Sequence, residues 1–167
     1  MKWNNKLETC ENMFSGLINI TEIDFSYFDT SRVTSMEAMF YNCENLISII
    51  NINHFNTLDL SSFDTSLVTS MSRMFFCCYK LIILDISNFN TTSTKNMNSM
   101  FRKCNLLISL DTSKFDTSLV TDMAHMFDEC KSLISLNVYS FNTSLVENMK
   151  FMFHGLENLD SLDLLNF

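Results

Sequence analysis

The dipeptide Met-Phe recurs along the whole chain, and this recurrence is the strongest constraint on the fold. It begins at residues 13, 39, 74, 100, 126 and 152, so the intervals are 26, 35, 26, 26 and 26 residues. The aligned unit reads V-T-x-M-x-x-M-F-x-x-C-x-x-L-I-x-L-D-I-S-x-F-[DN]-T-S. A fixed period of about 20 to 50 residues is typical of repeat proteins, whose units are stable only when stacked on their neighbours.

The apolar period changes within each unit, and this change predicts two elements. The first part carries apolar residues at spacings of three and four, the stripe of a short helix. In the second unit this stripe consists of Val33, Met36, Met39, Phe40 and Cys43. Later in the unit, Leu84-Asp85-Ile86 alternates apolar and polar residues, as a short strand does. The sequence therefore predicts an α/β solenoid of about six 26-residue units, each a short helix plus a short parallel strand.

Residues 1–167 are predicted to form a single repeat domain with a nine-residue insertion within residues 50–62. The insertion repeats the strand phrase, as N-I-N-H-F-N-T and then L-D-L-S-S-F-D-T. Loops that leave a rigid scaffold often carry specificity, so His54 and Phe55 are candidate binding residues. A neutral duplication is the alternative. At the ends, Thr21 and Asp160 replace the Ile of the repeat, which predicts polar end caps on a stack that could be one segment of a longer solenoid.

Composition excludes several classes of protein. Hydrophobic residues make up 47% of the 167 residues, which excludes a disordered chain. The net charge of −8 argues against a nucleic-acid-binding surface. No apolar run reaches the length of a membrane span, and no secretory signal or anchor is recognised, so the compartment stays open.

The runs L-D-I-S-N-F-N-T at 84–91 and V-T-D-M-A-H-M-F-D-E-C-K-S-L at 120–133 resemble the BspA-like leucine-rich repeat, which is common in bacterial surface proteins. The resemblance extends over essentially the whole chain. It implies a leucine-rich-repeat-like solenoid on the cell surface or outside the cell, with an adhesion or protein-binding role and no catalysis.

An Asp/Asn residue recurs at the centre of the predicted strands. The members of this Asp/Asn column are Asp24, Asn51 or Asp59, Asp85, Asp111, Asn137 and Asp163. Flanked by inward apolar residues, these side chains should point outwards and could contact a cationic patch on a protein partner. The alternative is that they bond to nearby backbone amides. Calcium is not expected, because the spacing matches no loop with converging carboxylates.

Other recurring positions are interpreted as structural. A second acidic column, Asp29, Asp64, Asn90, Asp116 and Asn142, is assigned to turns and helix caps. The Met, Phe and Cys columns are assigned to the core. The column of Ile47, Ile82, Ile108 and Ile134 is also expected to be core, and would be an apolar interaction strip if it were exposed.

No catalytic, metal or cofactor site is predicted. His54, His125 and His154 occupy unrelated positions of different units, and no nucleophile, base and acid converge. The predicted function is a non-catalytic protein-binding or adhesion module without nucleic-acid binding or membrane insertion. The alternative is a structural subunit of a larger assembly, docked or self-associated through the solenoid ends or docked through the Ile strip.

Overall fold

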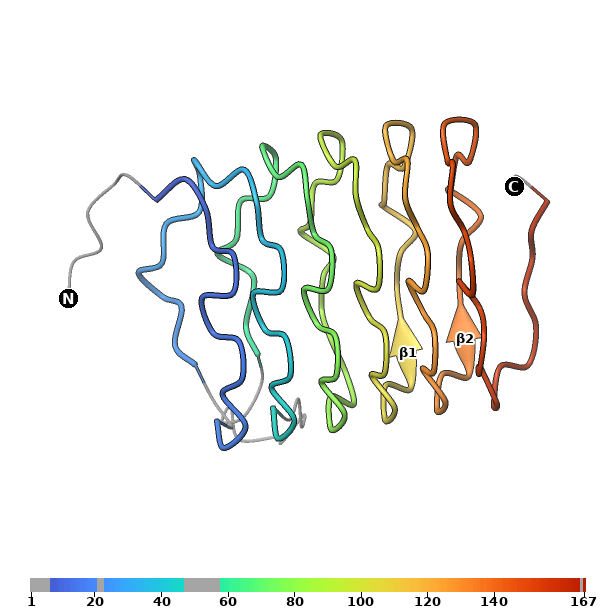
Figure 1. Ribbon diagram of the computed structural model, residues 1–167, viewed down its shortest axis with the longest axis horizontal. Coiled ribbons are helices and arrows are strands. Elements are labelled where there is room, and N and C mark those ends of the chain that lie inside the picture. Colours follow the sequence, from blue (N-terminus) through green and yellow to red (C-terminus); the bar gives the residue numbers. More distant parts are fainter. Residues whose placement is uncertain (1–6, 21–22, 47–57, 166) are drawn as a thin grey trace.

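The computed structural model describes residues 7–20, 23–46, 58–165 and 167. Each repeat forms one coil of the chain, and the coils lie side by side along the long axis of the molecule (Figure 1). The first and last described coils lie at opposite ends of this axis. Stacking by repeats is therefore as the 26-residue period indicates.

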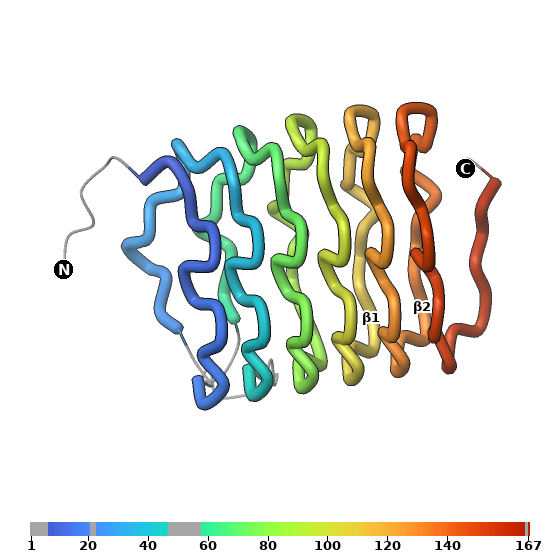
Figure 2. The backbone as a smooth tube through the Cα atoms, viewed as in Figure 1, coloured from blue at the N-terminus to red at the C-terminus, as the bar shows by residue number. Residues whose placement is uncertain are grey.

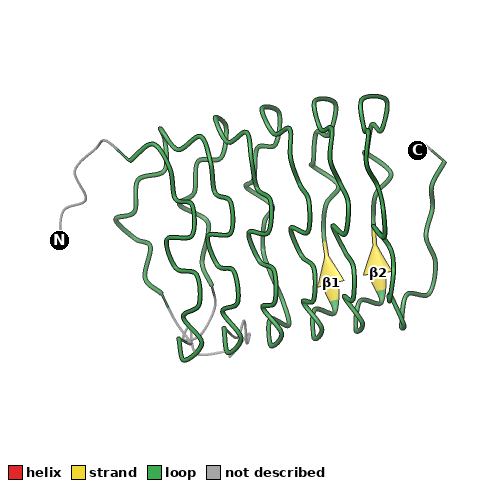
Figure 3. Cartoon of the chain, viewed as in Figure 1, coloured by secondary structure: helices red, strands yellow, loops and turns green. Residues whose placement is uncertain are grey.

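The helix predicted for each unit is wrong. Among the described residues there is no helix, and the regular strands are β1 (Ser109–Leu110) and β2 (Ser135–Leu136), which pair in parallel (Figure 3). The chain is therefore not an α/β solenoid of helix–strand units. Most of each coil consists of tight turns and extended segments that fall outside both regular classes.

The predicted helical segments form instead one long face of the stack, here called the ladder face. It comprises residues 9–16, 35–42, 70–77, 96–103, 122–129 and 148–155. Every second residue of one segment donates its backbone N–H to a carbonyl of the next coil. Between the fourth and fifth segments, the donors Met97, Ser99, Phe101 and Lys103 lie 2.8–3.0 Å from the carbonyl oxygens of residues 122, 124, 126 and 128.

The residues between these donors bond within their own coil. In the second segment, the N–H of Met39 bonds to the carbonyl of Met36, and just beyond the segment the N–H of Cys43 bonds to the carbonyl of Phe40. The third residue of each turn, Ala38 or Asn42, has a φ of 53° or 58°. A positive φ at this position is the signature of a type II turn, and it ends any continuous α-helix. Apolar residues three and four apart thus face the core from successive turns rather than from one helix.

The interior is filled by the predicted core columns. Phe14, Phe40, Phe75, Phe101, Phe127 and Phe153 stack one above another, with ring centroids 5.5–6.1 Å apart and planes within 13° of parallel. The Met and Cys columns beside them are fully buried in the interior coils. The six cysteines are buried and unpaired, as expected for packing residues. Figure 2 shows the backbone of successive coils following one another along the long axis of the molecule.

The opposite long face, here called the strand face, is held less regularly. Ser109 pairs with Ser135 and Leu110 with Leu136 in β1 and β2, and Ile83 forms an isolated bridge to Ser109. Next to this face a buried Thr column joins the coils. Thr91 Oγ1, for example, donates to the carbonyl of Asp116 and accepts from its N–H, both at 2.8 Å.

The Ile column is not fully buried at any of its described members, and Ile82 is partly exposed. Ile108 and Ile134 are 42% and 47% exposed, because the inward positions of this turn are taken by Leu107 and Leu133. The expectation of a buried column is therefore wrong for these two residues. Ile47 lies outside the described residues.

Candidate functional site

The Asp/Asn column lies at the surface of the strand face, directly after β1 and β2 in their coils. Its described members accept a hydrogen bond at Oδ1 from the backbone N–H two residues ahead, at 2.9–3.0 Å. The members are Asp24, Asp59, Asp85, Asp111, Asn137 and Asp163. The structure therefore shows, for one side-chain oxygen of each member, the alternative in which these residues bond to nearby backbone amides. All six side chains remain exposed, so this role does not remove them from contact with a partner.

Three members of this column line one groove. Asp59, Asp85 and Asp111 border a groove of about 520 Å³, whose apolar wall includes the partly exposed Ile83. The groove therefore combines an acidic edge with an apolar lining. Here it is called the acidic groove. A second groove of about 340 Å³ continues past Asp111 to Asn137.

The acidic groove is anionic at neutral pH. Hydrogen bonds from Ser87 lower the pKa of Asp85, and hydrogen bonds from Ser113 lower the pKa of Asp111. Repulsion between neighbouring coils acts in the opposite sense, since Asp85 raises the pKa of Asp59 and Asp111 raises that of Asp85, but the hydrogen bonds outweigh it. A row of carboxylates that repel one another gains most from a ligand that is cationic.

The other two candidate residues are not placed. His54 and Phe55, with most of the insertion, lie outside the described residues. Only residues 58–62 of the predicted insertion are described, and Leu58 to Ser61 belong to the acidic groove.

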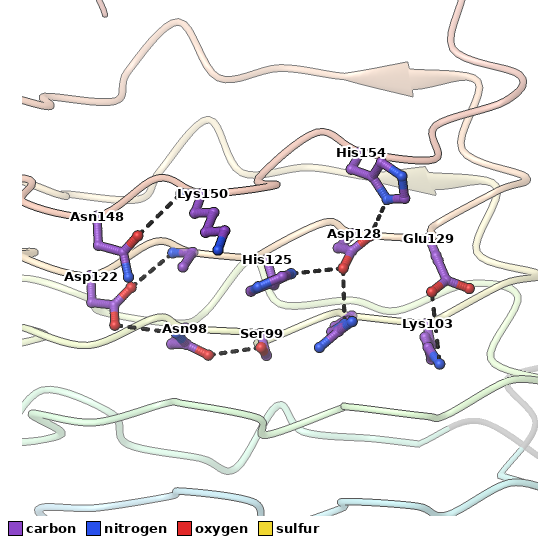
Figure 4. Close-up of polar contacts among 12 residues, drawn as sticks. Asn98, Ser99, Lys103, Asp122, His125, Asp128, Glu129, Asn148, Lys150 and His154 are labelled. Atoms are coloured by element: carbon purple, nitrogen blue, oxygen red, sulfur yellow. Dashed lines mark hydrogen bonds and ion pairs between the residues drawn. The ribbon is translucent and has the colours of Figure 1, made fainter.

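A polar cluster on the ladder face was not predicted from the sequence. Asp128 is nearly fully buried, and its Oδ1 lies 2.7 Å from Nδ1 of His154 in the next coil. Its Oδ2 lies 2.8 Å from Nδ1 of His125 in the same coil and 2.9 Å from Nε of Arg102 in the previous coil. Figure 4 shows the two imidazoles meeting the carboxylate from different sides. The cluster therefore ties three coils together.

The electrostatics of this cluster favour an ionised Asp128. Burial raises the pKa of this carboxyl, but hydrogen bonds from His154 and His125 and the charge of Arg102 outweigh it, and the net shift of the pKa is downward. An ionised carboxylate only accepts hydrogen bonds, so each imidazole donates through Nδ1. The neighbouring Ser99 hydroxyl donates to Asn98 at 2.7 Å, and no hydrogen bond joins it to His125. The geometry is thus that of a structural ion cluster and not of an activated serine.

The spacing of the repeat was the signal that could have revealed this cluster. Asp128 and His154 are 26 residues apart, one repeat, so they occupy the same position of adjacent coils. His125 and Asp128 are three residues apart across one turn. Considering each histidine alone hides this relation, whereas aligning the repeats as columns predicts it.

The repeat position of Asp128 and His154 is occupied in the earlier coils by a row of aromatic and cationic residues. Tyr41 and Phe76 stack with ring centroids 5.1 Å apart, and the guanidinium of Arg102 lies 5.5 Å from the Phe76 ring centroid. This row borders a shallow groove of about 670 Å³ that also contacts Arg73 and Glu37. The faces of the Phe76 ring are occupied by its neighbours, so the row serves the stacking of coils more than the binding of a flat ligand.

Within the described ranges, no three His, Cys, Asp or Glu side chains are placed to hold a metal ion. The buried thiols are poor nucleophiles, since burial raises the pKa of Cys10 to about 11 and of Cys130 to about 12. The part of the chain that the structure describes contains no helix able to cross a membrane.

Two overlapping segments, residues 1–59 and 49–167, match the family described as Mycoplasma protein of unknown function, DUF285. The matches together span the whole chain. The chain belongs to the DUF285 family. No curated protein and no solved structure matches it. The family description names no activity, so what this DUF285 protein does is inferred from its own geometry.

Proposed function

We propose that this DUF285 protein is a non-catalytic binding module that holds a protein partner in the acidic groove of the strand face. The observation that carries the proposal is the alignment of Asp59, Asp85 and Asp111 along one groove with an apolar wall. Backbone turns fix one oxygen of each carboxylate, so the row is preorganised before a partner arrives.

The partner that fits this groove is an extended, Lys- or Arg-containing protein segment. Its cations would offset the repulsion between stacked carboxylates, and its apolar side chains would pack against the partly exposed Ile83. Among the described residues, one cation, Lys114, lowers the pKa of both Asp85 and Asp111. Its ammonium group donates a hydrogen bond to the carbonyl of Ser87 at 3.3 Å. The row therefore remains largely uncompensated, and binding should weaken as salt is added.

The resemblance to BspA-like repeats supports the same kind of function. In that family the repeats serve adhesion and protein binding at the cell surface. We therefore infer a surface-interaction role without catalysis as the broader setting of the acidic groove.

The test removes charge without breaking the turns. Asp85→Asn combined with Asp111→Asn keeps an Oδ1 acceptor in place, as Asn137 does at the same position of the next coil. A labelled extended peptide that alternates Lys with apolar residues is titrated by fluorescence anisotropy. Loss of two exposed charge pairs should weaken binding by roughly 2- to 30-fold at low salt.

A matched control uses the second acidic column. Asp64 and Asp116 hold the same kind of turn, at 3.0 and 2.9 Å, and Asn90 occupies their position in the coil between them. Asp64→Asn combined with Asp116→Asn changes the net charge equally and should leave peptide affinity almost unchanged. Equal losses in both double variants would show that only net charge matters and would reject the groove.

A second candidate function, a structural subunit of a larger assembly, is favoured by the exposed Ile strip. Ile108 and Ile134 lie in adjacent coils, joined by a hydrogen bond of 2.9 Å from the N–H of Ile134 to the carbonyl of Ile108. Ile108→Lys combined with Ile134→Lys would release the protein from such an assembly while peptide binding in the acidic groove persists.

A further inference from the structure

The two end coils leave core-type side chains incompletely covered. Among the described residues, the hydrophobic side chains that pack on the core yet stay partly exposed all belong to the first or last coil: Leu7, Met13, Phe14, Ile20, Ile23, Val146, Phe153, Leu156, Leu159, Leu162 and Phe167. Met149 of the last coil is 40% exposed, whereas Met123 at the same position of the previous coil is 0% exposed. Among the described residues, each end coil therefore presents side chains whose equivalents in the interior coils are buried.

The backbone at the C-terminal end presents a row of donors. In the previous coil, the N–H groups of residues 123, 125, 127 and 129 donate to the last coil. The corresponding N–H groups of Met149, Phe151, Phe153 and Gly155 have no hydrogen-bond partner among the described residues.

The N-terminal end presents the matching row of acceptors. In the second coil, the carbonyls of residues 35, 37, 39 and 41 accept from the first coil. The corresponding carbonyls of Thr9, Glu11, Met13 and Ser15 accept no hydrogen bond from another described residue. One end thus carries only donors along its ladder face and the other only acceptors, both repeating every two residues.

We propose that the last coil of one copy stacks on the first coil of a second copy, head to tail, and continues the ladder face across the junction. The register follows from the interior, where Asp122 pairs with Asn148 and Thr9 with Ser35, each 26 residues apart. Asn148 then pairs with Thr9 of the second copy. The four donors would meet the four acceptors, an arrangement that two identical ends facing each other cannot provide.

The side chains fit this register as well as the backbone does. Phe153 would lie over Phe14 and extend the column of stacked rings. Lys150 would lie opposite Glu11, which is a pair of opposite charges across the junction. Glu147 would face Glu8, and Arg32 already lies 4.0 Å from that Glu8 carboxylate. The occupant that the end surface fits is therefore another copy of this chain.

This association goes beyond the proposed binding function and uses a different surface. The acidic groove lies on the strand face of the second to fourth coils, away from both end coils. The double variant Asp85→Asn and Asp111→Asn should therefore weaken peptide binding while self-association continues. Failure of one proposal leaves the other intact.

The experiment measures mass against concentration by sedimentation velocity and light scattering. A head-to-tail contact does not close, so the chain should form a concentration-dependent series of oligomers rather than one dimer. Met149→Lys places an unpaired charge in the junction and should abolish the series. Leu119→Lys is the matched control, because Leu119 is 43% exposed on an interior coil, and it should leave the series unchanged.

Charge exchange tests the register itself. Lys150→Glu or Glu11→Lys alone puts like charges opposite each other and should weaken association roughly 2- to 10-fold. The combined variant restores an opposite-charge pair and should recover most of the affinity. A protein that is monomeric at all concentrations, or a combined variant no better than the single ones, would overturn the proposal.

Discussion

The ladder face and the strand face are built from the same six coils, yet they hold those coils together by different means. On the ladder face every second backbone N–H bonds to the next coil, and two residues per coil adopt a positive φ to permit this pattern. On the strand face regular pairing is limited, within the described residues, to β1 with β2 and one bridge beside them. Side chains, above all the buried Thr column, join the coils there instead.

The difference shows how one repeat can combine rigidity with a variable surface. On the ladder face the backbone groups are hydrogen-bonded between coils and the Phe and Met side chains pack inward, so the sequence of this face is constrained by stacking. The strand face leaves its Asp/Asn column exposed and tied only by one oxygen each, so these residues remain available for a ligand. Four sets of substitutions test this division, from the largest expected effect to the smallest.

Phe101→Ala should be the most damaging change. The ring stacks on Phe75 and Phe127, at 5.8 Å on both sides, and is fully buried. Its removal should cost about 3–5 kcal/mol of the free energy of unfolding, measured by urea denaturation. Leu110→Ala in β1 should cost less. If the two losses are equal, the ladder face is not the more tightly packed side.

Asp128→Asn should come next, at about 3 kcal/mol, because it breaks a buried ion cluster that joins three coils. The pKa of Asp128 is lowered in the folded state. Its stabilisation is therefore complete above the ordinary carboxyl pKa near about 4 and is lost as pH falls through the lower, folded value.

Unfolding curves of both proteins between acid and neutral pH check this prediction: the gap between them should be constant near neutrality and close in acid. Asp111→Asn on the strand face is the comparison, and it should stay within about 0.5 kcal/mol of the unsubstituted protein. A pH-independent gap for Asp128→Asn would contradict the role of an ionised carboxylate.

The glycines test the turns of the ladder face at its two ends. Gly16 and Gly155 occupy the same position of the first and last coils, with φ of 74° and 72°. An added Cβ would meet nothing within 4 Å at Gly16 but would lie 3.3 Å from the Cα of Glu129 at Gly155. Gly16→Ala should cost about 1–2 kcal/mol and Gly155→Ala about 2–3 kcal/mol in thermal or urea unfolding. Identical losses would mean that backbone conformation alone decides the cost.

Thr91→Val should have the smallest of these effects, about 1 kcal/mol, since it removes the two hydrogen bonds to the backbone of Asp116 while keeping the shape of the side chain. Thr92→Val, at an exposed hydroxyl bonded to Asn90, serves as the control and should be nearly neutral. Urea denaturation of both variants measures the difference. A larger loss at Thr92 would mean that turn formation, and not the joining of coils, governs the strand face.

The sequence was sufficient to predict the stacking and the core, but not the backbone conformation. Buried Met, Phe and Cys columns follow from any arrangement that superimposes residues one repeat apart. The prediction of a helix was wrong because type II turns also place residues three and four apart on one side of the chain. The two glycines carried the missing information. Each stands one residue before the Cys or Leu of the repeat, and the residue at this glycine position has a positive φ in every described coil.

The site was predictable only in part for a related reason. The Asp/Asn column was recognised because the same residue type recurs in each unit. The cluster around Asp128 combines different residue types from three units, so it has no repeat signature of its own. It becomes visible only when unlike residues at the same position of neighbouring coils are considered as contacts.

The bonding pattern of the ladder face also gives the molecule an electrical direction. On the ladder face, four parallel files of peptide groups point their N–H toward the C-terminal coil and their C=O toward the N-terminal coil. Other N–H groups, such as those of Thr34, Thr121 and Ile134, point toward the preceding coil instead. Peptide dipoles of about 3.5 D aligned as in the four files add, as they do along an α-helix. The ladder face should therefore contribute a dipole along the long axis, and transient electric birefringence would measure the net moment of the molecule.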